Sequence, residues 1–206
     1  MKINNIGTVL FDLDGTLVNP SKRLYQLFVE LTGCGLSYDE YWELKDQGLN
    51  QSKMLQYIHF ENCSIEEFSR QWIMNVERED LLKIDFLFNE VKSILSILKR
   101  IDIRLFVVTN RQSYDGLCDE LEYLGIFEAF EAIVSTFQKC SKADAVRMAN
   151  IDINDAIFVG DSREDMQAAK DLGIRGVLVE RKSDKDVNIE ADYYIRDLND
   201  LRGILF

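Results

Sequence analysis

The stretch Val9–Val18, VLFDLDGTLV, carries two carboxylates, Asp12 and Asp14, directly after an apolar run and before a turn at Gly15. Residues 7–12 are expected to form a buried β-strand, because a short apolar run ends there at turn residues. Two like charges close together in a buried turn repel each other. The stretch therefore predicts a strand that is followed by two carboxylates, with a positively charged group between them.

From about residue 89 onwards, apolar runs alternate with amphipathic segments. Near-continuous apolar strands that alternate with helices are typical of a parallel sheet covered on both faces. We therefore expect an α/β fold, a Rossmann-like doubly wound parallel sheet. Its further strands are expected at IRLFVVTN (103–110), EAIVS (131–135), AIFVGDS (156–162) and IRGVLVE (174–180), with an edge strand at ADYYI (191–195).

Residues 19–88 have a different character, since they hold half of the aromatic residues and both tryptophans. The spacing of apolar residues is helical, as in RLYQLFVELTG, which is expected to end at Gly33. A later helix begins with Ser64 and Glu67 as a predicted capping box. The pattern predicts an α-helical insert at 19–88 with its own core, and an α/β domain formed by 1–18 and 89–206.

Polar side chains follow the predicted strands where each strand ends. Ligands bind at the carboxyl ends of the strands in open parallel sheets, so these side chains are expected to meet in one crevice. They are Asp12, Asp14, Thr109, Asn110, Lys142, Asp161 and Asp165.

A cluster of carboxylates favours Mg²⁺, which prefers oxygen ligands. Thr109, Asn110 and Lys142 supply donors for a phosphate group, and we place the turn residue Gly15 in the same binding group. Asp12 is expected to attack the phosphoryl group and form an aspartyl-phosphate. Asp14 is expected to protonate the departing oxygen and then to activate water.

These motifs resemble the haloacid dehalogenase (HAD) superfamily, in its phosphoglycolate phosphatase and β-phosphoglucomutase-like branch. The matching segments are DLDGT, the threonine of VVTN, the lysine of CSKADAV, and GDSREDMQAAKDLG. The resemblance implies that Asp12 is the nucleophile and Asp14 the acid/base, with its carbonyl on Mg²⁺. It also implies that Asp161 binds Mg²⁺ with Asp165 in support, and that residues 19–88 form a C1-type cap.

The sequence departs from the family pattern at Lys142, which is followed by Ala143 where the family often has proline. Lys139 is therefore a competitor for the same role. In the insert, LKDQGLNQSK occupies the position of the family's specificity loop, so Lys45, Asn50 or Lys53 could contact substrate, although a solvated surface is the commoner role for such residues. Arg111 and Arg163 are expected to be exposed partners of salt bridges.

Composition excludes several functions. The net charge of −12 argues against binding of nucleic acid or of an anionic membrane. Four cysteines without CxxC spacing and a single histidine, His59, argue against a zinc site and against histidine-based nucleophilic catalysis. With no leader and no apolar run of membrane length, we expect a cytoplasmic protein, a monomer or homodimer.

The favoured function is hydrolysis of a small phosphorylated metabolite. A phosphomutase of the β-phosphoglucomutase type would use the same residues and differ only in the cap. A dehalogenase is disfavoured by Asp14, which that chemistry does not need. A phospho-aspartate receiver domain is disfavoured by the large insert and by the second aspartate.

Overall fold

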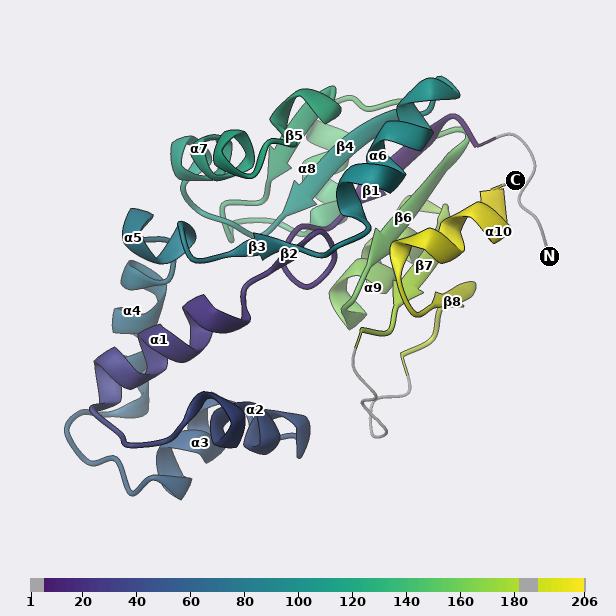
Figure 1. The fold of residues 1–206 in the computed structure, drawn as a ribbon. Coiled ribbons are helices and arrows are strands. Elements are labelled where there is room, and N and C mark those ends of the chain that lie inside the picture. Colours follow the sequence, from purple (N-terminus) through teal and green to yellow (C-terminus); the bar gives the residue numbers. More distant parts are fainter. Residues whose placement is uncertain (1–5, 182–188, 206) are drawn as a thin grey trace. The chain divides into compact units, whose positions relative to one another are not determined.

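The computed structural model describes residues 6–181 and 189–205 (Figure 1). The chain divides into two compact units. Of the described residues, one unit contains 6–19, 86–181 and 189–205, and the other contains Pro20–Asp85. The sequence placed the divisions after residues 18 and 88. Those bounds stay a prediction, and so does the role of the second unit as a cap.

The first unit is built on a parallel sheet of six strands in the order β5-β4-β1-β6-β7-β8. This confirms the predicted fold class, including the edge strand. Strand β1 lies between β4 and β6, so the residues that follow these three strands emerge side by side. The strands are β1 (Thr8–Phe11), β4 (Arg104–Thr109), β5 (Ala132–Ser135), β6 (Ala156–Gly160), β7 (Arg175–Val179) and β8 (Tyr193–Ile195).

Helices cover both faces of this sheet (Figure 1). Successive strand residues point to opposite faces, so Val9 and Phe11 join one apolar cluster and Leu10 joins the other. The first cluster includes α6, α7 and α10, and the second includes α8 and α9. The helices are α6 (Val91–Arg100), α7 (Tyr114–Leu124), α8 (Lys142–Met148), α9 (Arg163–Leu172) and α10 (Leu201–Leu205), with 3-10 turns at Phe127–Ala129 and Leu198–Asp200.

A short antiparallel ribbon joins β2 (Val18–Asn19) to β3 (Phe86–Leu87). The sequence does not predict this ribbon, because strands of two residues show no periodicity in the sequence. The ribbon brings together the two places where the chain leaves the first unit and returns to it.

The second unit contains five helices among its described residues. Its core is aromatic: Phe28 packs against Tyr41 and Phe68, with ring centroids 5.1 and 6.1 Å away. Helix α1 ends at Gly33, which has a φ of 66°, as the sequence predicts. The helices are α1 (Ser21–Thr32), α2 (Tyr38–Asp46), α3 (Gln51–Tyr57), α4 (Ile65–Asn75) and α5 (Glu79–Leu82).

The capping box predicted at Ser64 and Glu67 forms only in part. The Ser64 hydroxyl accepts a hydrogen bond from the Glu67 amide, but the Glu67 carboxylate accepts from Arg70 and Gln71 on its own helix. A complete box forms at the start of α9, between Ser162 and Asp165. Within residues 6–181 and 189–205, every helix is too short or too polar to span a bilayer.

Candidate active site

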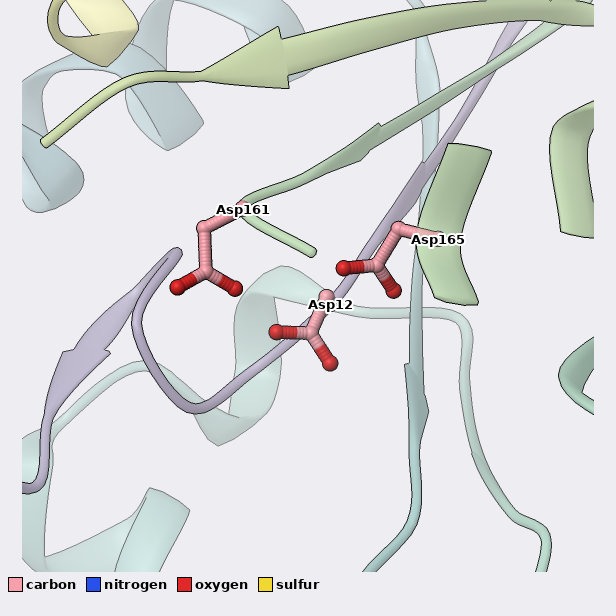
Figure 2. A group of neighbouring side chains, drawn as sticks. All are labelled: Asp12, Asp161 and Asp165. Carbon is pink, nitrogen blue, oxygen red and sulfur yellow. The ribbon is translucent and has the colours of Figure 1, made fainter. Parts of the chain in front are cut away.

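Three carboxylates meet beside the carboxyl ends of β1 and β6 (Figure 2). Asp12 directly follows β1, Asp161 directly follows β6, and Asp165 lies in the first turn of α9. One oxygen of each lies within 4.8 Å of an oxygen of the others. The structure therefore brings together three of the four aspartates that the sequence analysis assigned to a metal.

The cluster carries negative charge that the protein compensates only in part. Burial raises the pKa of Asp12 well above its ordinary value, and the charges of Asp165 and Asp161 raise it further. Burial and the charge of Asp165 raise the pKa of Asp161 to about 7. In this arrangement, a proton or a cation is held more strongly than at an isolated carboxylate.

Lys142 is the positive group within this cluster. It begins α8, where the hydroxyl of Ser141 caps the helix by accepting from the Asp144 amide at 3.1 Å. The Lys142 ammonium donates to the carboxylates of Asp12 and Asp165, the latter at 2.6 Å. Although burial lowers the pKa of Lys142, the two carboxylates raise it above its ordinary value. Lys139, the competitor in the sequence, is exposed.

Asp165 is fixed by its helix as well as by the lysine. Its Oδ2 accepts from the amide and the hydroxyl of Ser162, at 3.0 and 2.5 Å. It also packs against the last residue of β6: a Cβ atom on Gly160 would lie 2.3 Å from the Asp165 carboxyl carbon. Both carboxylate oxygens thus bond to protein groups, which suits a residue that supports the cluster.

Asp14 lies outside the group of three. Its two carboxylate oxygens accept from Arg111, from Nε at 2.5 Å and from Nη2 at 2.9 Å. Arg111 also bonds to Glu120 of α7, with 3.1 Å between Nη2 and Oε2. The expectation that Arg111 is an exposed salt-bridge partner was wrong about its exposure: its side chain is 5% exposed, because Glu120 draws it into the core.

Thr109 and Asn110, expected to bind phosphate, follow the neighbouring strand. Thr109 is the last residue of β4 and is buried. The Asn110 amide donates to Glu164 of α9 at 2.8 Å, and its oxygen accepts from the Thr136 hydroxyl at 2.9 Å. These bonds tie Asn110 to α9 on one side and to the loop that follows β5 on the other.

Arg181 also holds the loop after β1, and nothing in the sequence indicates this role. Arg181 donates to the carbonyls of Gly15 and Thr16 at 3.1 and 2.6 Å. It also pairs with Glu90 at 2.6 Å and stacks over the ring of Phe88 at 3.5 Å. The guanidinium therefore ties the loop to the segment that follows β3.

Of the residues expected to contact substrate from the helical insert, Asn50 has a local role. The Asn50 side chain caps α3 by accepting from the Lys53 amide at 3.0 Å. A substrate contact by Lys45, Asn50 or Lys53 stays a prediction.

A family model of haloacid dehalogenase-like hydrolases matches residues 9–179, from the second residue of β1 to the end of β7. The chain belongs to the haloacid dehalogenase-like hydrolases. The match covers the loop after β1, the end of β4, the start of α8 and the loop after β6. These are the four places at which the carboxylates, Thr109 and Lys142 lie.

Relatives of this hydrolase match over nearly its whole length. Pyrophosphatase PpaX of Bacillus velezensis is 27% identical, over 99% of this chain and 98% of that protein. A crystal structure from Clostridium difficile superposes with a TM-score of 0.79 at 21% identity, covering 98% of this chain and 100% of the other. A predicted phosphoglycolate phosphatase from Haemophilus somnus superposes with a TM-score of 0.73 at 22% identity, covering 96% and 97%.

These findings confirm the predicted family and the fold of a haloacid dehalogenase-like hydrolase. They also confirm that the chain is an enzyme, a hydrolase of phosphoester bonds. The two structural neighbours share the fold at low sequence identity.

Proposed function

We propose that this hydrolase is a Mg²⁺-dependent phosphatase that cleaves a small phosphorylated metabolite through an aspartyl-phosphate on Asp12. The observation that carries the proposal is the cluster of Asp12, Asp161 and Asp165 around the ammonium of Lys142. Asp12 lies at the end of the central strand, where the backbone holds it firmly for attack on phosphorus.

The residues present fit a divalent cation. Lys142 offsets one of the three negative charges of the cluster, so the remaining two match the charge of Mg²⁺. The neighbouring carboxylates also raise the pKa values of Asp12 and Asp161, in addition to the larger effect of burial, and a bound cation would oppose both effects. Asp12, Asp161 and the Asp14 carbonyl would hold the ion, with Asp165 in support. When bound, Mg²⁺ would neutralise charge that develops on the transferred phosphoryl group.

The protein's own groups carry the two steps of the reaction. In the first, an Asp12 oxygen bonds to phosphorus, the bond to the leaving oxygen breaks, and Asp14 gives that oxygen a proton. In the second, Asp14 takes a proton from water, which attacks phosphorus and releases phosphate and free Asp12. Lys142 and Thr109 would stabilise the phosphoryl oxygens.

The substrate class is a small phosphate ester or anhydride. Pyrophosphate and phosphoglycolate are the first substrates to assay, because the names of two similar proteins contain them. A phosphomutase would use the same aspartates, so isomerisation of a hexose 1-phosphate is assayed in parallel. A cytoplasmic location and a monomeric or homodimeric state stay predictions.

The test compares Asp12→Asn with Asp102→Asn, an exposed residue whose φ of 60° suits asparagine. Asp12→Asn is expected to abolish phosphate release and to leave the circular dichroism spectrum unchanged, while Asp102→Asn keeps full activity. Phosphate release by Asp12→Asn at the unmodified rate would remove Asp12 from the nucleophilic role. Activity in EDTA without added Mg²⁺ would contradict the metal dependence.

A further inference from the structure

Arg111 lies two residues beyond the end of β4 and presents its guanidinium to Asp14. The two hydrogen bonds, at 2.5 and 2.9 Å, engage both carboxylate oxygens of Asp14. A bidentate pair of this kind fixes the plane of the carboxylate as well as its distance. The orientation of Asp14 in this structure is therefore set in part by the position of Arg111.

Arg111 is itself held by an ion pair with Glu120. Glu120 belongs to the buried side of α7, between Leu117 and Leu121, and its side chain is fully buried. A carboxylate in such surroundings is costly unless a cation pairs with it, and Arg111 supplies that cation at 3.1 Å. The Arg111 backbone is also held, since its carbonyl accepts from the Ser135 hydroxyl.

We propose that Arg111, held by Glu120, is the positioning residue that orients the Asp14 carboxylate to take a proton from the attacking water. This inference rests on the acid/base role of Asp14 in the proposed function. A side chain that exchanges a proton with two different oxygens in turn must stay within reach of both, and misplacement by about 1 Å costs a catalytic group about 10²-fold.

The contacts of Arg111 with Glu120 and with Asp14 differ in exposure. They are therefore expected to differ in how much they affect folding and how much they affect the reaction. The Arg111–Glu120 contact is buried on both sides, so removal of one partner alone is expected to destabilise the fold. The Asp14 side chain is 31% exposed, and partly exposed ion pairs contribute little to stability. The contact between Arg111 and Asp14 is therefore expected to affect the reaction much more than folding.

The test is a double-mutant cycle on the rate of phosphate release. Arg111→Met is combined with Glu120→Gln, so that no unpaired carboxylate stays buried. In the unmodified background this pair of changes is expected to lower kcat by about 10- to 100-fold, with KM changed by less than about threefold. In an Asp14→Asn background the same pair is expected to change kcat by less than about twofold.

Two further variants complete the cycle. Arg111→Lys keeps the positive charge but lacks the two parallel donors of the guanidinium. Its kcat is therefore expected to lie between that of the unmodified enzyme and that of Arg111→Met/Glu120→Gln. Arg104→Met is the matched control, because Arg104 begins β4 at its other end and forms an exposed pair with Glu131 at 2.9 Å. It is expected to leave kcat unchanged. Equal losses of kcat in the two backgrounds, or a rise in KM alone, would overturn the inference.

A crystal structure of Arg111→Met/Glu120→Gln separates this inference from the proposed function. The Asp14 carboxylate is expected to lose its single orientation in that variant. An unchanged orientation would overturn the positioning role whatever the enzyme hydrolyses. If instead the unmodified enzyme releases no phosphate from any phosphorylated metabolite, the proposed function fails. The orientation of the Asp14 carboxylate in the variant still tests whether Arg111 positions it.

Discussion

A Cβ atom placed on Gly15 would lie 2.1 Å from Oδ2 of Asp161, closer than any real contact allows. Gly15 also has a φ of 89°, which residues with a side chain rarely adopt. The turn after β1 and the end of β6 therefore fit together only because residue 15 has no side chain. This contact joins the loop of Asp14 to one of the carboxylates proposed to hold Mg²⁺.

Gly15→Ala is expected to lower phosphate release at least about tenfold, because the new methyl group displaces either the turn or the Asp161 carboxylate. The concentration of Mg²⁺ needed for half-maximal activity is expected to rise in parallel. Gly35→Ala is the control, since the space around Gly35 is open. Full activity of Gly15→Ala would show that the turn and Asp161 can separate without consequence.

Lys142→Met is expected to abolish activity and to lower the stability of the metal-free protein. The change leaves Asp12 and Asp165 facing each other without the cation that now bonds to both. Thermal unfolding in EDTA measures the loss of stability, and phosphate release measures the loss of activity. Lys139→Met is the matched control, because Lys139 lies on the loop just before α8 and is exposed. Activity lost in Lys139→Met and kept in Lys142→Met would reverse the assignment of the two lysines.

Much of the sheet and of the carboxylate cluster could be predicted from local sequence patterns. Apolar runs marked β1, β4 and β6, and the polar residue after each run marked the edge of the sheet where ligands bind. Gly33, with a φ of 66°, ended its helix where the sequence predicted. These features depend on neighbours in the sequence, so the sequence alone reveals them.

The supports of the site could not be predicted, because their partners are far away in the chain. Arg181 contacts Gly15 across 166 residues, and nothing near Arg181 in the sequence marks that contact. Arg111 bonds to Asp14 across 97 residues. One local signal existed: Glu120 places a charge within the apolar stripe of α7, and a buried charge requires a partner.

The metal-free protein is expected to lose stability as the pH rises from about 4 to about 7. The pKa of Asp161 is raised from 3.8 to about 7 in the folded chain, so over this range the folded state holds a proton that the unfolded state has released. Stability falls with pH wherever the folded state binds more protons. Burial shifts the pKa of Asp12 in the same direction.

Thermal unfolding in EDTA at pH 5 and pH 8 measures this effect. Mg²⁺ is expected to raise the unfolding temperature more at pH 8 than at pH 5, because a proton occupies Asp161 much less often at pH 8. Asp161→Asn is expected to reduce the difference between the two pH values in EDTA, and the raised pKa of Asp12 accounts for what is left. An unfolding temperature in EDTA that rises from pH 5 to pH 8 would contradict the raised pKa.

Arg181→Met is expected to destabilise the enzyme by about 1–3 kcal/mol and to lower kcat, because it removes the donors of the Gly15 and Thr16 carbonyls and the partner of Glu90. The loop that it releases carries Asp14, so the loss of kcat is expected to exceed any change in KM. Chemical denaturation and steady-state kinetics measure the two effects. Arg175→Met, an exposed arginine at the other end of β7, is expected to change neither. If Arg181→Met lowered stability but left kcat unchanged, Arg181 would support the fold without positioning the loop after β1.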